Sequence, residues 1–136
     1  MKKKDIKILL VDDEQDILEI VGYNLSQEGY QIVTASNGKE AIAKAKKEHP
    51  QLIIMDVMMP EMDGMEACEN IRKIPELQDT IITFLTARSE DYSQVAGFDA
   101  GADDQLMLVH GIFGPFENII EVVMRVFFEG KTHRNR

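Results

Sequence analysis

Four apolar residues run directly into two carboxylates in the segment Ile8-Leu9-Leu10-Val11-Asp12-Asp13, and the segment Leu52-Ile53-Ile54-Met55-Asp56 repeats this pattern. A short apolar run that is bounded by polar residues predicts a buried strand, so each aspartate is expected where a strand ends. The carboxyl ends of parallel strands line the ligand crevice of an α/β sheet. Carboxylates that meet there repel one another unless a cation neutralises them, and oxygen ligands suit Mg²⁺. The two segments therefore predict a site for a metal and a phosphate group.

Strand and helix patterns alternate around these two segments. The expected strands are Ile6–Val11, Tyr30–Ala35, Gln51–Met55, Ile81–Thr86 and Gln105–Val109. The expected helices are Gln15–Gln27, Lys39–Glu48, a third that carries Met65, Cys68 and Ile71, a short fourth from Ser89 to about Phe98, and Pro115–Glu129. Such β-α units with short connections indicate a parallel sheet that is covered on both faces.

Length and composition limit the class of protein. A chain of 136 residues forms one domain, expected at residues 1–130 with a polar tail at residues 131–136. A net charge of −9 argues against nucleic acid binding by the domain itself. The apolar stretch behind Met1-Lys2-Lys3-Lys4 is too short for a signal peptide, and no stretch is long enough to span a membrane. The single Cys68, expected as a small apolar residue on a helix, fits a reducing cytoplasm.

Each aspartate also has a plain structural interpretation. Asp12 and Asp13 could cap the helix that follows them, and Asp56 could begin a turn. Their joint placement at the ends of two strands favours a functional site, because a sheet brings those ends together.

The loop Met55-Asp56-Val57-Met58-Met59-Pro60-Glu61-Met62-Asp63-Gly64 is much more specific. Together with Val11-Asp12-Asp13-Glu14, Leu85-Thr86-Ala87 and Gly101-Ala102-Asp103-Asp104, it resembles the receiver domain of two-component response regulators, from Lys7 to about Asp104. The resemblance implies a flavodoxin-like (βα)5 three-layer α/β fold, with a five-stranded parallel sheet in the strand order 2-1-3-4-5.

The resemblance also implies a role for each residue of the acidic pocket. Asp56 is expected to accept a phosphoryl group from the phosphohistidine of a sensor histidine kinase. Asp13, Asp56 and the backbone carbonyl of Met58 are expected to hold Mg²⁺, with Asp12 completing the pocket. The domain would then be a regulatory phosphoacceptor rather than an enzyme.

Further roles implied by the resemblance lie in the neighbouring loops. Thr86 would donate its hydroxyl to a phosphoryl oxygen, and the backbone N–H of Ala87 would assist. Pro60 and Gly64 would shape the loop around the phosphorylation site. The added phosphoryl charge could draw in such a hydroxyl, which makes a switch from local electrostatics.

The chain departs from the family where a lysine followed by proline normally ends the fifth strand. Counting from Gly101-Ala102-Asp103-Asp104 places Leu108-Val109 there, and counting from the last helix places Gly111-Ile112 there. Residues 74–130 contain no lysine at all. Because that lysine bonds a phosphoryl oxygen, its loss is expected to weaken both phosphoryl transfer and signal transmission.

No nearby residue is an obvious replacement for the missing lysine. Arg88 and His110 are the basic residues closest in sequence, and both are more simply explained as solvated side chains. The aromatic residue that usually accompanies the switch threonine is also missing, since Gln105 stands in its place. An alternative function is therefore a degenerate receiver that serves as a phosphorylation-independent dimerisation or docking module.

The last predicted helix is apolar on more than one face. Glu117, Glu121, Arg125 and Glu129 form one polar stripe, whereas Ile120, Met124 and Phe128 lie outside the face that a sheet would cover. This pattern predicts a homodimer, or an exchanged segment, through the C-terminal helix. A second explanation is that residues after Asp104 are not the family's natural sequence, for instance through a frame change in the gene.

Two enzyme or cofactor classes fit the sequence poorly. An aspartyl-phosphate hydrolase usually carries a second acid two residues after its nucleophile, where this chain has Met58. A flavin-binding protein needs a phosphate-cradling loop of Ser, Thr and Gly after the first strand, where this chain has Asp12-Asp13-Glu14.

Overall fold

The computed structural model describes residues 2–86 and 108–109, with the backbone alone at Thr86, Leu108 and Val109. The strands are β1 (Lys7–Val11), β2 (Gln31–Ala35), β3 (Leu52–Asp56), β4 (Ile81–Thr86) and β5 (Leu108–Val109). The α-helices within the described ranges are α1 (Gln15–Gln27), α2 (Gly38–Glu48) and α3 (Gly64–Arg72). Two short 3-10 helices, η1 (Lys3–Asp5) and η2 (Pro75–Leu77), were not predicted.

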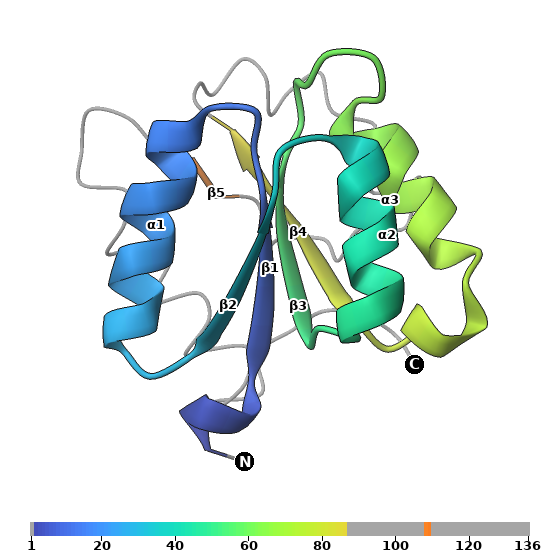
Figure 1. Ribbon diagram of the computed structural model, residues 1–136. Coiled ribbons are helices and arrows are strands. Elements are labelled where there is room, and N and C mark those ends of the chain that lie inside the picture. The colour runs from blue at the N-terminus through green and yellow to red at the C-terminus, as the bar shows by residue number, and fades with distance from the viewer. Residues whose placement is uncertain (1, 87–107, 110–136) are drawn as a thin grey trace.

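The strands form one parallel sheet in the order β2-β1-β3-β4-β5, as the resemblance implied (Figure 1). The central strand β1 pairs with β2 on one side and with β3 on the other, and Val11 lies opposite both Ala35 and Met55. The carboxyl ends of β1 and β3 are therefore neighbours. This register places Asp12 and Asp56 at the same edge of the sheet.

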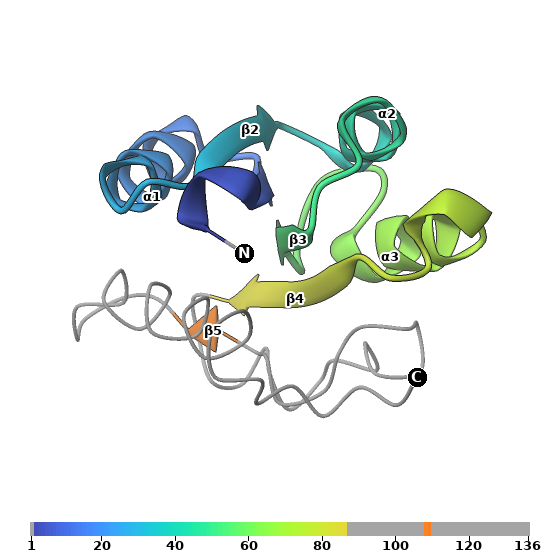
Figure 2. The same ribbon diagram turned by 90° about the horizontal axis from the view of Figure 1, so that it is seen from below.

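Helices cover both faces of the sheet, with α1 on one face and α2 and α3 on the other (Figure 2). Successive residues of the inner strands enter opposite core layers, because strand side chains alternate. Ile8, Leu10 and Ile54 pack with α1, whereas Leu9 and Ile53 pack with α2 and α3. Burial on both faces explains why β1 and β3 are continuous apolar runs rather than alternating ones.

The helices bury the faces that their spacing predicts. Helical spacing places Ile17, Leu18, Val21 and Leu25 on one face of α1, and the last three are buried whereas Ile17 is half-buried. The inward face of α2 consists of small side chains, among them the buried Ala41 and Ala45. Cys68 is fully buried on α3, as expected of a small apolar residue on a helix.

Side-chain caps begin α2 and α3, and a proline follows the end of α2. Asn37 caps α2 by accepting the N–H of Glu40, and Asp63 caps α3 by accepting the N–H of Glu66, both at 2.8 Å. His49 ends α2 in a left-handed conformation, with φ of 49°, directly before Pro50. The helix ends there because a residue before a proline is sterically disfavoured in the α-helical region.

Most predicted boundaries are correct within one residue, and α1 and β4 match fully. One difference affects the site, because β3 includes Asp56 as its last residue instead of ending at Met55. The ladder therefore fixes the backbone of Asp56, which lies opposite Leu85 of β4. The predicted helices after Ser89 and Pro115, and residues 105–107 of the predicted fifth strand, lie outside the described residues.

Candidate functional site

Three aspartates from two neighbouring strand ends meet at the carboxyl edge of the sheet. Asp12 and Asp13 follow β1 directly, and Asp56 is the last residue of β3. One carboxylate oxygen from each of the three residues lies within 4.8 Å of the other two. The structure thus brings together the acidic residues that the sequence singled out.

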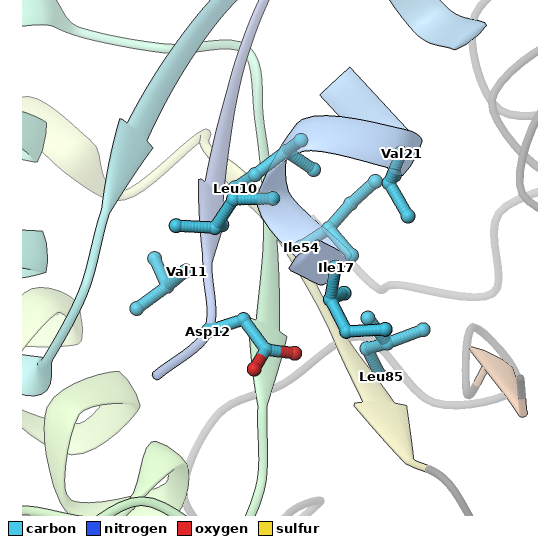
Figure 3. A pocket seen from close by; sticks show the side chains of 8 residues that line it. Leu10, Val11, Asp12, Ile17, Val21, Ile54 and Leu85 are labelled. Carbon is cyan, nitrogen blue, oxygen red and sulfur yellow. The ribbon is translucent and has the colours of Figure 1, made fainter. Parts of the chain in front are cut away.

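Asp12 is the most deeply buried of the three carboxylates. Its side chain is 3% exposed, and its Oδ1 accepts the N–H of Glu14 at 2.8 Å. It borders a pocket under α1 whose other described lining residues are all apolar (Figure 3). Burial beside these side chains, with a smaller contribution from the charge of Asp13, raises the pKa of Asp12 from 3.8 to about 6.

Asp56 is half-buried, and its environment disfavours the charged form even more strongly. Burial, followed by the negative charge of Asp12, raises the pKa of Asp56 from 3.8 to about 7. The N–H of Met58 opposes this shift by donating to Oδ1 of Asp56 at 3.3 Å. Asp13 is exposed at the rim of the same cluster.

Neither aspartate after β1 is the N-cap of α1. The N-cap is Glu14, whose side chain makes no capping hydrogen bond. Asp12 instead accepts the N–H of Glu14 ahead of the helix. The capping interpretation of the pair is therefore wrong, because both carboxylates belong to the acidic cluster.

Glu14 is an acidic neighbour that the sequence did not assign to the site. Its negative charge adds to the effect of burial in raising the pKa of both Asp12 and Asp56. Its place directly after Asp13 was the signal in the sequence that could have assigned it to the site. The local charge is thus more negative than three aspartates alone would make it.

The segment between Asp56 and α3 is a tightly closed loop. The N–H of Gly64 donates to the carbonyl oxygen of Val57 at 2.9 Å, and the N–H of Met62 donates to that of Pro60 at 2.8 Å. Between them Glu61 adopts a left-handed conformation, with φ of 68°. A Cβ atom on Gly64 would overlap the carbonyl oxygen of Asp56, which gives a steric reason for glycine there.

The backbone of Thr86 lies at the end of the strand next to β3. Thr86 is the last residue of β4, one residue beyond the partner of Asp56, and its backbone lies opposite Val109 of β5. The Thr86 side chain and all of Ala87 lie outside the described residues. Leu108, one of the positions where the family lysine was sought, lies opposite Leu85 at the end of β4.

Comparison with known proteins identifies the family of this chain. The family model described as the response regulator receiver domain matches residues 8–107. The alkaline phosphatase synthesis transcriptional regulatory protein PhoP of Bacillus subtilis is 46% identical over 100 residues, which are 74% of this chain and 41% of that protein. The transcriptional regulatory protein ResD of the same organism is 42% identical over 118 residues, covering 87% of this chain and 47% of that protein. This chain spans less than half the length of both relatives.

Solved structures of response regulators superimpose on this chain. The chemotaxis response regulator CheY4 of Vibrio cholerae superimposes with a TM-score of 0.80 and 34% identity, covering 90% of this chain and 98% of that one. The response regulator TrrA of Thermotoga maritima, solved in complex with Mg²⁺-BeF, has a TM-score of 0.75 and 37% identity, covering 90% and 99%. No helix within residues 2–86 has the length and apolar character that crossing a membrane requires. The chain belongs to the response regulator receiver domain family.

Proposed function

We propose that this domain accepts a phosphoryl group on Asp56 from the phosphohistidine of a sensor histidine kinase, with Mg²⁺ bound beside it. The observation that carries the proposal is the cluster of Asp12, Asp13 and Asp56, with one oxygen of each within 4.8 Å of the others. Membership of the receiver family supports the same reaction. The domain is then a regulatory phosphoacceptor rather than an enzyme that turns over a separate substrate.

The donor set of this site fits a hard divalent cation. All three side chains offer carboxylate oxygen, the ligand type that Mg²⁺ prefers. Burial and the charges of neighbouring carboxylates raise the pKa of Asp12 and Asp56, and a cation bound in the cluster would offset those negative charges. Asp12, Asp13, Asp56 and the backbone carbonyl of Met58 would hold the ion. When bound, Mg²⁺ supplies positive charge that offsets the negative phosphoryl oxygens.

Asp56 would act as the nucleophile. An oxygen of its ionised carboxylate attacks phosphorus in line, so that a new P–O bond forms while the P–N bond to the histidine breaks. The departing imidazole takes the bonding electron pair, and the phosphoryl group moves without any additional reactant. Because β3 holds the backbone of Asp56 and Met58 donates to its Oδ1, the carboxylate is oriented before the donor arrives.

Two further groups complete the proposed site. The hydroxyl of Thr86 would donate to a phosphoryl oxygen, and the N–H of Ala87 would donate to another. The support for Thr86 is its place at the end of β4, beside the strand that carries Asp56. Movement of this hydroxyl toward the new charge would transmit the modification to β4 and β5.

The proposed domain covers residues 1–130, and residues 131–136 form a polar tail. The curated relatives are transcriptional regulatory proteins of more than twice the matched length, so control of transcription is the output that they suggest. The acidic net charge of −9 argues that the receiver does not itself bind nucleic acid. The fully buried Cys68 is compatible with a reducing cytoplasm.

The proposal is tested by incubating the chain with Mg²⁺ and a small phosphodonor such as acetyl phosphate, followed by intact-protein mass spectrometry. We expect a gain of one phosphoryl group that requires Mg²⁺ and is lost in Asp56→Asn. Asp63→Asn is a matched control, because Asp63 caps α3 and is not part of the acidic cluster. A wild-type chain that gains no phosphoryl group would contradict the proposal.

A degenerate receiver that works as a docking module is the second candidate. The observation that favours it is the lack of lysine throughout residues 74–130, where the family places one at the end of the fifth strand. The docking function predicts that partner binding is the same for the wild type and for Asp56→Asn. The switching function predicts that binding differs between the phosphorylated and unphosphorylated wild type.

A homodimer through residues 116–128 is proposed from the apolar composition of that segment, which lies outside the described residues. Sedimentation equilibrium over a range of concentrations tests it. A rising apparent mass that falls again in the double variant Ile120→Glu/Met124→Glu supports the dimer. A constant monomer mass contradicts it.

A further inference from the structure

The side chain of Met62 lies directly over Gly38, where the loop after β3 meets the first turn of α2. A Cβ atom added to Gly38 would lie 2.8 Å from both Cγ and Sδ of Met62 and 3.0 Å from its Cβ. Gly38 is buried, and Met62 is half-buried against the core layer of α2 and α3. The methionine thus occupies the space that a side chain at position 38 would fill.

The loop around Met62 has few other attachments. Met58, Pro60 and Glu61 are exposed, and Glu61 is in the left-handed region that non-glycine residues seldom adopt. Val57 and Met59 are buried at the start of the loop. In its later half, before α3 begins at Gly64, Met62 packs against the core layer of α2 and α3.

We propose that Met62 is a positioning residue of the phosphorylation site, and that Gly38 is the receptor that seats it. The contact joins the β3–α3 loop to the start of α2 and thereby holds the turn between Val57 and Gly64. The backbone of Met58, whose N–H bonds Asp56 and whose carbonyl is a proposed Mg²⁺ ligand, lies inside this turn. The inference rests on the proposed function, because it concerns the metal ligands of that reaction.

The geometry predicts how Gly38→Ala acts. The backbone of Gly38 is that of an ordinary helix, capped by Asn37, so alanine is allowed there and is favoured by helix propensity. The new methyl group instead meets Met62, whose flexible Sδ end moves easily but whose Cβ is fixed to the loop. Alanine at position 38 is therefore expected to unseat Met62 and loosen the loop while the domain stays folded.

Gly22 provides a matched control. It lies buried inside α1, and a Cβ atom there would sit 3.6 Å from Ile32 Cγ2 and Leu10 Cδ1, which is ordinary van der Waals contact. Gly22→Ala is the same chemical change in another buried helical glycine, without a clash and away from the loop. It should leave the loop and the metal affinity unchanged.

The experiment compares wild type, Gly38→Ala, Met62→Ala, the double variant and Gly22→Ala. Three quantities are measured: Mg²⁺ affinity by calorimetry with the metal alone, amide hydrogen exchange at Met62 and Gly64, and the rate of phosphorylation by acetyl phosphate. Gly38→Ala and Met62→Ala should each weaken Mg²⁺ binding by about tenfold and speed amide exchange in the loop. The double variant should be no worse than either single one, because both remove the same contact.

The possible failures are distinguishable. If Gly38→Ala and Met62→Ala both keep the Mg²⁺ affinity and the amide exchange rates of the wild type, the role of Met62 is overturned, whatever the phosphorylation result. A different result is that both single variants bind Mg²⁺ more weakly and exchange loop amides faster, while the wild type binds Mg²⁺ but takes up no phosphoryl group. That result would support Met62 as a positioning residue for the metal and would contradict the phosphoacceptor function. A wild type that does not bind Mg²⁺ would overturn both proposals.

Discussion

Gly64 and Val57 close the loop that follows the candidate phosphoacceptor, with the N–H of Gly64 donating to the carbonyl oxygen of Val57 at 2.9 Å. The close approach brings the Cα of Gly64 against the backbone of Asp56, leaving no room for a Cβ atom. The start of α3 and the end of β3 are thus held together by backbone atoms. Loop geometry at the acidic cluster depends on this contact.

Gly64→Ala is therefore expected to disrupt the site. Because the overlap is with backbone rather than with a flexible side chain, the loop must shift, and we expect a loss of about 2 kcal/mol in the free energy of unfolding. Urea denaturation measures this loss, with Gly22→Ala as the variant that should not be destabilised. Stability and Mg²⁺ affinity equal to those of the wild type would show that the loop tolerates a side chain there.

The acidic cluster predicts an unusual dependence of stability on pH when metal is removed. The pKa of Asp12 is raised to about 6 and that of Asp56 to about 7, above the ordinary value of 3.8. Between the ordinary value and these raised values the folded state binds more protons than the unfolded state, so the free energy of unfolding falls as pH rises. The stabilisation by protonated Asp12 and Asp56 is therefore full below about pH 4 and is lost as pH rises through about 7. In EDTA at pH 8, Asp56→Asn should be more stable than the wild type, by on the order of 1 kcal/mol.

That difference should shrink toward pH 4, where the wild-type carboxyl is protonated, and urea denaturation at several pH values measures it. Saturating Mg²⁺ should stabilise the wild type and leave Asp56→Asn less affected. An Asp56→Asn variant that is less stable than the wild type at pH 8 without metal would contradict the account of the cluster.

Two threonines of the same region should respond oppositely to the same substitution. The hydroxyl of Thr83 is buried in β4, 1% exposed, and has no hydrogen-bond partner among the described residues. The hydroxyl of Thr80, also buried, donates to the carbonyl oxygen of Pro50 at 3.0 Å. Valine has nearly the same shape and no hydroxyl. Thr83→Val should therefore raise the free energy of unfolding by about 1 kcal/mol, and Thr80→Val should lower it by about 1 kcal/mol.

Chemical denaturation of the two variants side by side tests this pair. A loss of stability in Thr83→Val would contradict this expectation, because it would mean that the Thr83 hydroxyl makes a favourable interaction in the folded protein.

Restoring a cation at the end of β5 should strengthen phosphoryl transfer. Leu108 lies opposite Leu85, one residue before the pair formed by Thr86 and Val109. A lysine there would place positive charge near the transferred group, so Leu108→Lys should speed phosphorylation by acetyl phosphate by about tenfold. Leu108→Met, similar in length but uncharged, is the control. Equal rates in the wild type and in Leu108→Lys would show that this chain does not need the missing cation.

The sequence predicted most of the fold because its strongest signals are local. Continuous apolar runs at β1 and β3 and the spacing of Leu18, Val21 and Leu25 report burial directly. The extension of β3 to Asp56 was missed because a charged residue ends the apolar pattern although its backbone still pairs with β4. Element boundaries depend on such tertiary pairing more than on side-chain type.

The acidic part of the site was predicted because its residues also carry strong local signals. Adjacent strand ends bring Asp12 and Asp56 together whenever the sheet order is known, so motif and topology were sufficient. The contact of Met62 with Gly38 joins residues that are 24 positions apart, one in the β3–α3 loop and the other at the start of α2. Nothing in their local patterns specifies that contact, because a half-buried methionine in a loop can pack in many directions.

In the proposed reaction, Asp56 itself carries the phosphoryl group. Borohydride reduction of the protein after treatment with acetyl phosphate and Mg²⁺ converts a phosphoaspartate into homoserine, which peptide mass spectrometry then locates in the sequence. We expect homoserine at position 56 alone, dependent on Mg²⁺ and abolished in Asp12→Asn/Asp13→Asn. Homoserine at another aspartate, or none in a chain that binds Mg²⁺, would contradict it.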